Sequence, residues 1–418
     1  MPTRADAEAL DAADPVAGYR DRFVLDDDHQ IYLDGNSLGR PARSTVDRVS
    51  QLVEAWGHRL VGGWQDWEHL PLDVGDRLGR AVLGAGPGQV AVTDSTTVNL
   101  YKLAGAALDM KHPRRPVIVG DRHDFPTDRY VLEGLAAAHH AELRLVDTDP
   151  VEGPTCEALE AVIDPKRTAL VCLSHVNYRS AARAQMAQVT ELAHANDALM
   201  LWDLSHSAGA VPLHVDADGV DLAIGCSYKY LNAGPGAPAF LYVRQGLQAA
   251  LRQPIWGWFG QRDQFAMGQG YDPEPNIRRF LAGSPPILGV AAVAAGVELL
   301  GEAGIERLWA KSEALTALAI DLFDGWLAPL GCRLASPRET SRRGAHIAIG
   351  HPDGWQLCRA LIERAAVVPD FRPPDVIRLG PVPIYTRFVD VLDACDRLRQ
   401  LLSTGEYRQV HASPRRIT

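Results

Sequence analysis

Cysteine is scarce in this sequence and forms no recognisable metal or disulfide motif. Six cysteines occur among 418 residues, with no CxxC pair and no cysteine and histidine cluster at the spacing of metal ligands. The sequence therefore predicts neither a disulfide framework nor a bound metal. Scattered single thiols are typical of proteins in a reducing compartment, so we expect a cytoplasmic protein.

Excess basic charge and long apolar runs are also absent. Lysine and arginine number 42 against 52 acidic residues, a formal net charge of −10. Nucleic acids and anionic membrane surfaces favour basic partners, so we expect this protein to bind neither. The most apolar stretch, residues 287–297, is too short to span a bilayer, and the acidic N-terminus has no apolar targeting segment.

What the sequence does contain is the composition and patterning of an α/β protein. Apolar residues make up 46% of the chain and charged residues 22%, which is typical of a folded protein with a large core. Helical patterns alternate with short apolar runs, which are QVAVTD, PVIVGD, LRLVD, TALVCLS, ALMLWD, DLAIGC and AFLYV. Such runs resemble strands that are buried on both faces. The alternation predicts a mostly parallel sheet with helices on both sides.

The pattern changes in the last third of the chain. An irregular segment rich in Trp, Gly and Pro is followed by long helical patterns over residues 287–309 and 311–327, and then by short strands and helices. The latter predict a smaller α+β unit. We therefore expect an N-terminal arm (residues 1–50), a large domain (51–290) and a small C-terminal domain (291–418).

The strongest group of chemically functional residues lies in WDLSHSAGA and SYKYLNAGPG. Asp203 follows one predicted strand, and Lys229 follows the next and precedes a Gly-Pro-Gly loop. Ligands of parallel sheets bind at the carboxyl ends of strands, so both side chains can reach one crevice. A lysine that forms a Schiff base and a carboxylate that keeps a pyridine nitrogen protonated are what a pyridoxal phosphate site needs. Taken singly, Asp203 is also typical of a turn and Lys229 of a solvated surface.

Two further segments directly follow predicted strands. In DSTTVNL, the amides and hydroxyls of Thr96 and Thr97 open a helix and can bind an anion, although an ordinary helix N-cap has the same pattern. In HDFPTD, the ring of Phe125 can lie over a planar ligand or belong to the core. Both segments are therefore candidate parts of the Lys229 site.

Together these motifs resemble those of kynureninase, a family of pyridoxal phosphate enzymes with the aspartate aminotransferase fold. The resemblance covers nearly the whole chain and depends on YLDGNSLGRP, STTVNL, FPTD, LSHVNYRS, WDLSHSAG, CSYKYLNAGPG, GWFG, GSPPIL and IRLGPVPIY. It implies the type I fold of pyridoxal phosphate-dependent transferases. It also implies hydrolytic cleavage of the Cβ–Cγ bond of L-kynurenine, which yields anthranilate and L-alanine.

The resemblance implies roles for individual residues as well. Lys229 would bind pyridoxal 5'-phosphate and move the Cα proton, and Asp203 would pair with the pyridine nitrogen. Tyr228 would contact the phosphate and act as acid and base at the γ-carbonyl. The other implied cofactor contacts are Thr96, Thr97, Phe125, Asp128, Ser174 and His206, with Trp258 and Ser284 from the neighbouring subunit. A homodimer is therefore expected.

A third set of residues is expected to bind the substrate. These residues are Asn36, Ser37, Trp64 and Arg378. Arg378 lies in the apolar strand pattern VIRLG, where an unpaired guanidinium would be costly, and its planar fork suits a carboxylate. Animal relatives that prefer 3-hydroxykynurenine have a His and an Asn where this chain has Trp64, or its neighbour Gly63, and Ser284. We therefore expect L-kynurenine to be the better substrate, unless Trp64 is a core aromatic.

Two other functions remain open from the sequence. One is a different enzyme of the same fold, such as a cysteine desulfurase or an aminotransferase. Desulfurases use a cysteine on a mobile C-terminal loop and usually have a His directly before the lysine, where this chain has Tyr228, and neither Cys332 nor Cys358 resembles such a cysteine. The other is a non-catalytic scaffold, which would have no use for Lys229.

Overall fold

A seven-stranded sheet forms the centre of the molecule. The computed structural model describes residues 1–25, 27, 29–111 and 113–410. The strands of this sheet are β2 (Val90–Val92), β3 (Val117–Asp121), β4 (Glu142–Val146), β5 (Thr168–Ser174), β6 (Leu199–Asp203), β7 (Leu222–Gly225) and β8 (Phe240–Val243). Their order is β2-β8-β7-β6-β5-β3-β4, and only β8 runs antiparallel to its neighbours. Each of the seven predicted runs overlaps one of these strands, and the mostly parallel sheet is confirmed.

Successive residues of the central strands belong to two different cores. Val171 of β5 lies in one core, and its neighbours Leu170 and Cys172 lie in the other. The first core is closed by helices α4 (Leu70–Leu78), α8 (Met186–Ala195) and α10 (Ile287–Ala303), and the second by α5 (Thr96–Lys111) and α6 (Pro126–Ala138). Burial on both faces explains why these strands are continuously apolar.

A second, smaller sheet belongs to the C-terminal part of the chain. Its strand order is β12-β13-β10-β9, and β1 pairs separately with β11. The strands are β1 (Ile31–Tyr32), β9 (Arg333–Leu334), β10 (Ile347–Gly350), β11 (Val367–Val368), β12 (Asp370–Arg372) and β13 (Val376–Leu379). A third core joins this sheet to α1 (Arg4–Ala12), α11 (Ile305–Leu322), α12 (Gly354–Arg364) and α13 (Phe388–Thr404). The domain division at residues 50 and 290 stays a prediction.

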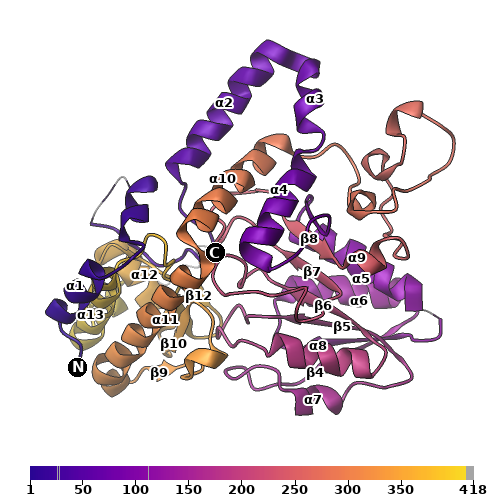
Figure 1. The fold of residues 1–418 in the computed structure, drawn as a ribbon. Coiled ribbons are helices and arrows are strands. Elements are labelled where there is room, and N and C mark those ends of the chain that lie inside the picture. Colours follow the sequence, from indigo (N-terminus) through magenta and orange to yellow (C-terminus); the bar gives the residue numbers. More distant parts are fainter. Residues whose placement is uncertain (26, 28, 112, 411–418) are drawn as a thin grey trace.

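Four other α-helices complete the described part of the chain. They are α2 (Arg43–Arg59), α3 (Trp64–Trp67), α7 (Cys156–Glu160) and α9 (Gln245–Gln248). Figure 1 shows α2 beside α10, extending away from the main sheet and followed by α3. As a result α2 exposes large apolar side chains, among them Val53 and Trp56.

The helical pattern over residues 287–327 is divided differently from the prediction. The prediction placed the break between residues 309 and 311, whereas α10 ends at Ala303 and α11 begins at Ile305. Gly304 between them has φ 82°, a conformation that glycine adopts without steric cost and that stops a helix. Within the described residues no single helix is long and apolar enough to span a membrane. The helical segments Ile287–Ala303 and Ile305–Leu330, which are bent by 80° relative to each other, have the length and composition of a membrane span only when they are taken together.

Candidate active site

The carboxyl ends of the parallel strands meet beside a cavity of about 400 Å³. β5 ends at Ser174 and β6 at Asp203, while Lys229 follows β7 and α5 begins at Thr96. The cavity is lined by Ser37, Thr96, Thr97, Phe125, Thr127, Asp128, Ser174, Tyr178, Asp203, Ser205, His206, Tyr228, Lys229 and Arg372. The fold thus brings most of the predicted residues to one place. The lining also includes four residues that were not predicted, Thr127, Tyr178, Ser205 and Arg372. The first three lie inside the motifs FPTD, LSHVNYRS and WDLSHSAG, and Arg372 lies five residues before IRLGPVPIY.

Lys229 lies against a buried histidine in this cavity. Its Nζ is 3.0 Å from Nε2 of His206 and 5.9 Å from the centre of the Tyr228 ring. Burial and the neighbouring Lys229 hold the pKa of His206 well below its usual value, so the imidazole is neutral. The Nδ1 atom of His206 is buried and has no hydrogen-bond partner among the described residues. The unprotonated nitrogen of a neutral imidazole can accept a hydrogen bond from a neighbouring amine.

Three carboxyl groups are concentrated at the strand ends. Asp203 accepts a hydrogen bond from the backbone N–H of Ser205 at 2.8 Å, and Asp124 accepts one from the N–H of Ser174 at 3.2 Å. Burial raises the pKa values of Asp124 and Asp128 well above the usual range, and the neighbouring carboxylates raise them further. Such a cluster attracts a proton or a cationic group, because carboxylates cannot all stay ionised at close range in a buried site.

The first turn of α5, which also lines the cavity, is suited to an anion. Thr96 and Thr97 form the first turn of the 16-residue helix α5, where free backbone N–H groups and the helix dipole favour negative charge. Burial raises the pKa of Tyr228, so its hydroxyl stays protonated at neutral pH and can donate a hydrogen bond. Phe125 is 42% exposed and meets the Tyr178 ring edge-on at 5.3 Å, so its ring borders the open part of the cavity.

Arg378, the predicted clamp for the α-carboxylate, is buried among hydrogen-bond partners. Its side chain is 1% exposed and is absent from the cavity lining. Its Nε donates to Asp370 at 2.6 Å, and other guanidinium N–H groups donate to the carbonyl of Tyr178 and to Ser37 Oγ. Asn36 is fully buried beside it, and its side-chain oxygen accepts from Arg378 at 3.3 Å when the amide is oriented to satisfy both groups. The buried arginine is therefore paired, as its apolar strand pattern requires.

Besides Asn36 and Arg378, three further predicted residues do not line the cavity of their own chain. Trp64 packs against Trp67 and Phe259, with ring centres 6.0 Å apart in both pairs, and it lines an apolar groove instead of the Lys229 cavity. Trp258 is 41% exposed, and Ser284 is also exposed. The structure of one chain therefore does not bring Trp64, Trp258 or Ser284 to its own Lys229.

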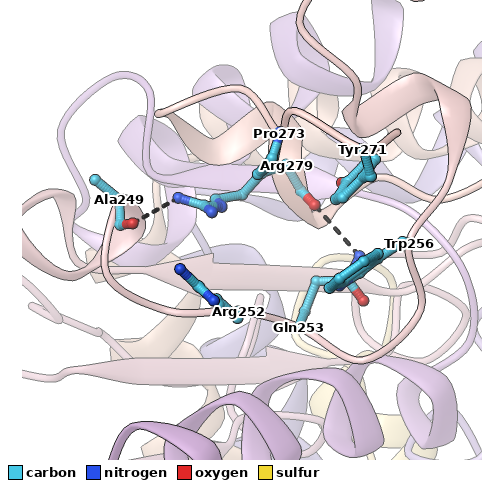
Figure 2. Close-up of a pocket in the computed structure, with 7 residues that line it drawn as sticks. All are labelled: Ala249, Arg252, Gln253, Trp256, Tyr271, Pro273 and Arg279. Atoms are coloured by element: carbon cyan, nitrogen blue, oxygen red, sulfur yellow. Dashed lines mark hydrogen bonds between the residues drawn. The ribbon is translucent and has the colours of Figure 1, made fainter. Parts of the chain in front are cut away.

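A second cavity, of about 230 Å³, shows how the segment that contains Trp258 and Ser284 is anchored (Figure 2). The buried guanidinium of Arg279 donates to the backbone carbonyl of Ala249 at 2.8 Å. On the other side of this cavity, the rings of Trp256 and Tyr271 stack at 5.0 Å. The Arg279 contact ties the irregular segment to the end of α9, and the ring stack lies within the segment itself.

The fold defines the class of protein. A cysteine desulfurase from Thermococcus onnurineus NA1 superimposes with a TM-score of 0.79 at 17% identity, covering 97% of this chain and 99% of that one. An alanine–glyoxylate aminotransferase from Nostoc sp. gives a TM-score of 0.68 at 19% identity, covering 90% and 96%. A lyase described as having glycine covalently linked to its PLP cofactor gives 0.75 at 16% identity, covering 96% and 99%. The chain therefore has the type I fold of pyridoxal phosphate enzymes.

Sequence comparison then gives the family. Residues 308–398 match the kynureninase C-terminal domain family. The kynureninases of Burkholderia pseudomallei (strain K96243) and Pseudomonas fluorescens are each 42% identical to this chain, covering 98% of it and 97% and 98% of their own lengths. The chain belongs to the kynureninase family. The predictions of this family, of a pyridoxal phosphate-dependent hydrolase acting on C–C bonds and of pyridoxal phosphate as cofactor are confirmed.

The polar groups of the cavity fit that cofactor. The carboxyl cluster around Asp203 suits a protonated pyridine nitrogen, the N-terminus of α5 suits a phosphate, and Lys229 supplies an amine in the same cavity. No group of three or more His, Cys, Asp or Glu side chains within the described ranges has the arrangement of a metal site.

Proposed function

We propose that the protein hydrolyses the Cβ–Cγ bond of L-kynurenine and releases anthranilate and L-alanine. The observation that supports this most directly is the meeting of Lys229, the Asp203 cluster and the N-terminus of α5 in one cavity, in a chain of the kynureninase family. Water is the second substrate. The oxygen of this water ends in the anthranilate carboxylate, and its two protons are distributed between the products.

Some residues around the cofactor would take part in the reaction, and the others would hold the cofactor in place. Pyridoxal phosphate, when bound, supplies an electron sink for bond cleavage. Lys229 holds it and moves the proton at the substrate Cα, and Asp203 keeps the ring nitrogen protonated. The supporting contacts are Asp128 and His206 near the ring, Phe125 over its face, Ser174 beside it, and Thr96, Thr97 and Tyr228 at the phosphate. This assignment is supported by the sharing of one cavity by all these side chains.

Tyr228 and the amino-acid end of the substrate complete the proposed mechanism. Because burial keeps the Tyr228 hydroxyl protonated, this residue can donate a proton at the γ-carbonyl when water adds and accept one as the bond breaks. Ser37, Asn36 and Arg378 form the proposed subsite for the α-carboxylate, which is supported by their mutual hydrogen bonds beside the cavity.

We also propose that the protein works as a cytoplasmic homodimer. Trp64 lines an apolar groove of about 370 Å³ together with Trp56, Leu60, Val61 and Leu288. Trp56, Leu60 and Val61 are 55%, 63% and 81% exposed in the single chain, and a contiguous apolar surface of this kind usually marks an interface. A second copy that covers the groove would bring Trp258 and Ser284 of one subunit near the phosphate end of the other.

The central experiment is an assay of the purified protein for anthranilate release from L-kynurenine, combined with its visible absorption spectrum. We expect the absorption of bound pyridoxal phosphate and stoichiometric formation of anthranilate and L-alanine. A cofactor-loaded protein that releases sulfur from cysteine or transfers an amino group, without forming anthranilate, would contradict the proposal in favour of a related enzyme. A correctly folded protein that binds no cofactor would favour a scaffold.

A further inference from the structure

The cavity of about 230 Å³ beside Arg279 is separate from the candidate active site. It shares no lining residue with the cavity that contains Lys229 or with the apolar groove proposed as the dimer interface. Figure 2 shows the guanidinium groups of Arg252 and Arg279 on one side of it and the stacked rings of Trp256 and Tyr271 on the other. One side of this cavity is therefore cationic and the other is aromatic.

Arg279 carries a buried positive charge that has no acidic partner. It is 7% exposed, and its Nη1 donates to the backbone carbonyls of Gln248 and Ala249 at 2.9 and 2.8 Å. Among the described residues, its other guanidinium N–H groups make no hydrogen bond and it forms no ion pair. The two carbonyls explain one nitrogen as a cap on the end of α9. They leave the charge itself uncompensated, which is costly in a buried position.

Arg252 adds a second cation at the same place. It is exposed, and it too has no hydrogen-bond or ion-pair partner among the described residues. Burial lowers the pKa of Arg279, and the nearby charge of Arg252 lowers it further. The two like charges therefore destabilise each other, although acidic residues outnumber basic ones in the chain. A carboxylate placed between them would remove this repulsion and accept the unused N–H groups.

The aromatic side of the cavity is held in a fixed position. Trp256 and Tyr271 stack with 18° between their ring planes, and Trp256 remains 63% exposed. The side chain of Gln253 accepts from the N–H of Ile255 at 2.7 Å and donates to the backbone carbonyl of Arg279 at 3.3 Å. The backbone next to Trp256 is thus tied to that of Arg279. The rings and the buried guanidinium are preorganised relative to each other, which lowers the cost of binding a ligand.

We propose that this cavity is a second ligand site, which binds a small aromatic carboxylate with its carboxylate between Arg252 and Arg279 and its ring against Trp256. A ligand that matches both sides needs an anionic group and a planar apolar group. The volume is smaller than that of sites for drug-sized molecules, so a ligand with a single ring is expected. The site does not depend on the proposed function, although anthranilate, the aromatic product of that reaction, has the required chemistry.

The test measures the binding of benzoate, benzamide and acetate to the cofactor-loaded protein by isothermal titration calorimetry. Benzamide has the ring of benzoate without its charge, and acetate has the charge without the ring. We expect a Kd for benzoate below about 1 mM and Kd values at least about tenfold higher for the other two ligands. Benzamide or acetate that binds as tightly as benzoate would overturn the inference.

Arg252→Gln tests the location of the site. Arg252 is exposed, so its replacement should leave the fold intact. The Kd for benzoate should rise about tenfold or more, because a charge-assisted hydrogen bond is lost, and the Kd for benzamide should change by less than about twofold. Benzoate binding that is unchanged in this variant would place the ligand elsewhere, the Lys229 cavity included, and would overturn the inference.

Arg262→Gln is the matched control. Arg262 belongs to the same irregular segment, is exposed and pairs with Asp272 at 3.4 Å, but it does not line the cavity. Its replacement should leave the Kd for benzoate within about twofold of the wild type, as expected for a surface ion pair. An equal loss of benzoate binding in Arg262→Gln and Arg252→Gln would show a general effect of charge and would overturn the inference.

Trp256→Ala tests the ring contact independently and decides the question if Arg252→Gln does not retain cofactor. The Kd for benzoate should rise about tenfold, whereas that for acetate should stay within about twofold because acetate has no ring to pack. An unchanged Kd for benzoate would overturn the inference. Wild-type protein that binds benzoate as expected but releases no anthranilate from L-kynurenine would contradict the proposed function and support the second site, so the two failures are distinguishable.

Discussion

At the scale of single residues, the position of Lys229 relative to Asp203 follows from strand order. β6 and β7 are neighbours and parallel, so the residues that follow them leave the sheet at the same edge. His206, three residues beyond the end of β6, therefore reaches Lys229 at 3.0 Å. Sequence motifs were sufficient to find these side chains because each comes soon after a strand.

Replacement of Lys229 tests the proposed cofactor linkage. Lys229→Ala should lose the visible absorption of bound cofactor after extensive dialysis and should have no measurable anthranilate release, since no other lysine lines the cavity among the described residues. Circular dichroism serves as the control for folding. A folded variant that keeps the wild-type absorption band would remove Lys229 from the proposed role.

Asp34 links the carboxylate subsite to pH. Its pKa in the folded protein is about 7, whereas an unfolded aspartate titrates near 3.9, so the native state holds a proton that the unfolded chain releases between these values. Its contribution to stability is therefore present at low pH and falls as the pH rises to about 7. Asp34→Asn removes this titration, and its stability relative to the wild type should increase by up to about 3 kcal/mol between pH 4.5 and pH 8.

Urea unfolding of the cofactor-loaded proteins, at equal protein concentration, measures this difference. If the free energy of unfolding of Asp34→Asn minus that of the wild type is the same at both pH values, Asp34 does not titrate in this range. If this difference falls as the pH rises, the predicted direction of the pKa shift is wrong.

At the scale of elements, the roles of α3 and of residues 254–286 are what a single chain leaves undecided. Trp64 of α3 was predicted either to face the substrate ring or to be a core aromatic, and in one chain it packs on Phe259 in the apolar groove. Any effect of Trp64 or Ser284 on the substrate must therefore be exerted across the proposed dimer interface. Propensity and motif matching describe one chain and do not reveal which surfaces a second copy covers.

Substrate preference tests this placement. An apolar wall gives no hydrogen bond to a 3-hydroxyl, so kcat/KM for L-kynurenine should exceed that for 3-hydroxykynurenine by about tenfold or more. The double variant Trp64→His with Ser284→Asn should shift the ratio toward the hydroxylated substrate. Trp56→His, in the same groove, is the control and should leave the ratio unchanged. Wild-type preference for 3-hydroxykynurenine, or an unmoved ratio in a folded and loaded double variant, would refute the prediction.

At the scale of the whole molecule, the exposed apolar groove predicts an obligate dimer. The interface should bury about 2,000 Å² or more. Val61→Asp places a charge where the side chain is 81% exposed in one chain, and the cost of burying that charge should shift the protein toward monomers at micromolar concentration and lower its cofactor content. Analytical ultracentrifugation with activity measurement is the appropriate experiment.

Leu10→Asp provides the comparison for the dimer prediction. Leu10 is an apolar residue of α1, 41% exposed, and does not line the groove. This variant should stay dimeric. A wild-type protein that sediments as a monomer at assay concentration and still releases anthranilate would rule out the obligate dimer.

The sequence by itself determined the elements and the type of chemistry. Strands buried on both faces must be continuously apolar, and a pyridoxal phosphate site needs residue types that are recognisable at strand ends, as at Asp203 and Lys229. The tertiary structure alone decided how side chains share their partners. Arg378 donates to the carbonyl of Tyr178 and to Ser37 Oγ, which lie 200 and 341 residues away in the sequence. Such pairing depends on contacts between distant segments, whose geometry is not encoded in any local pattern.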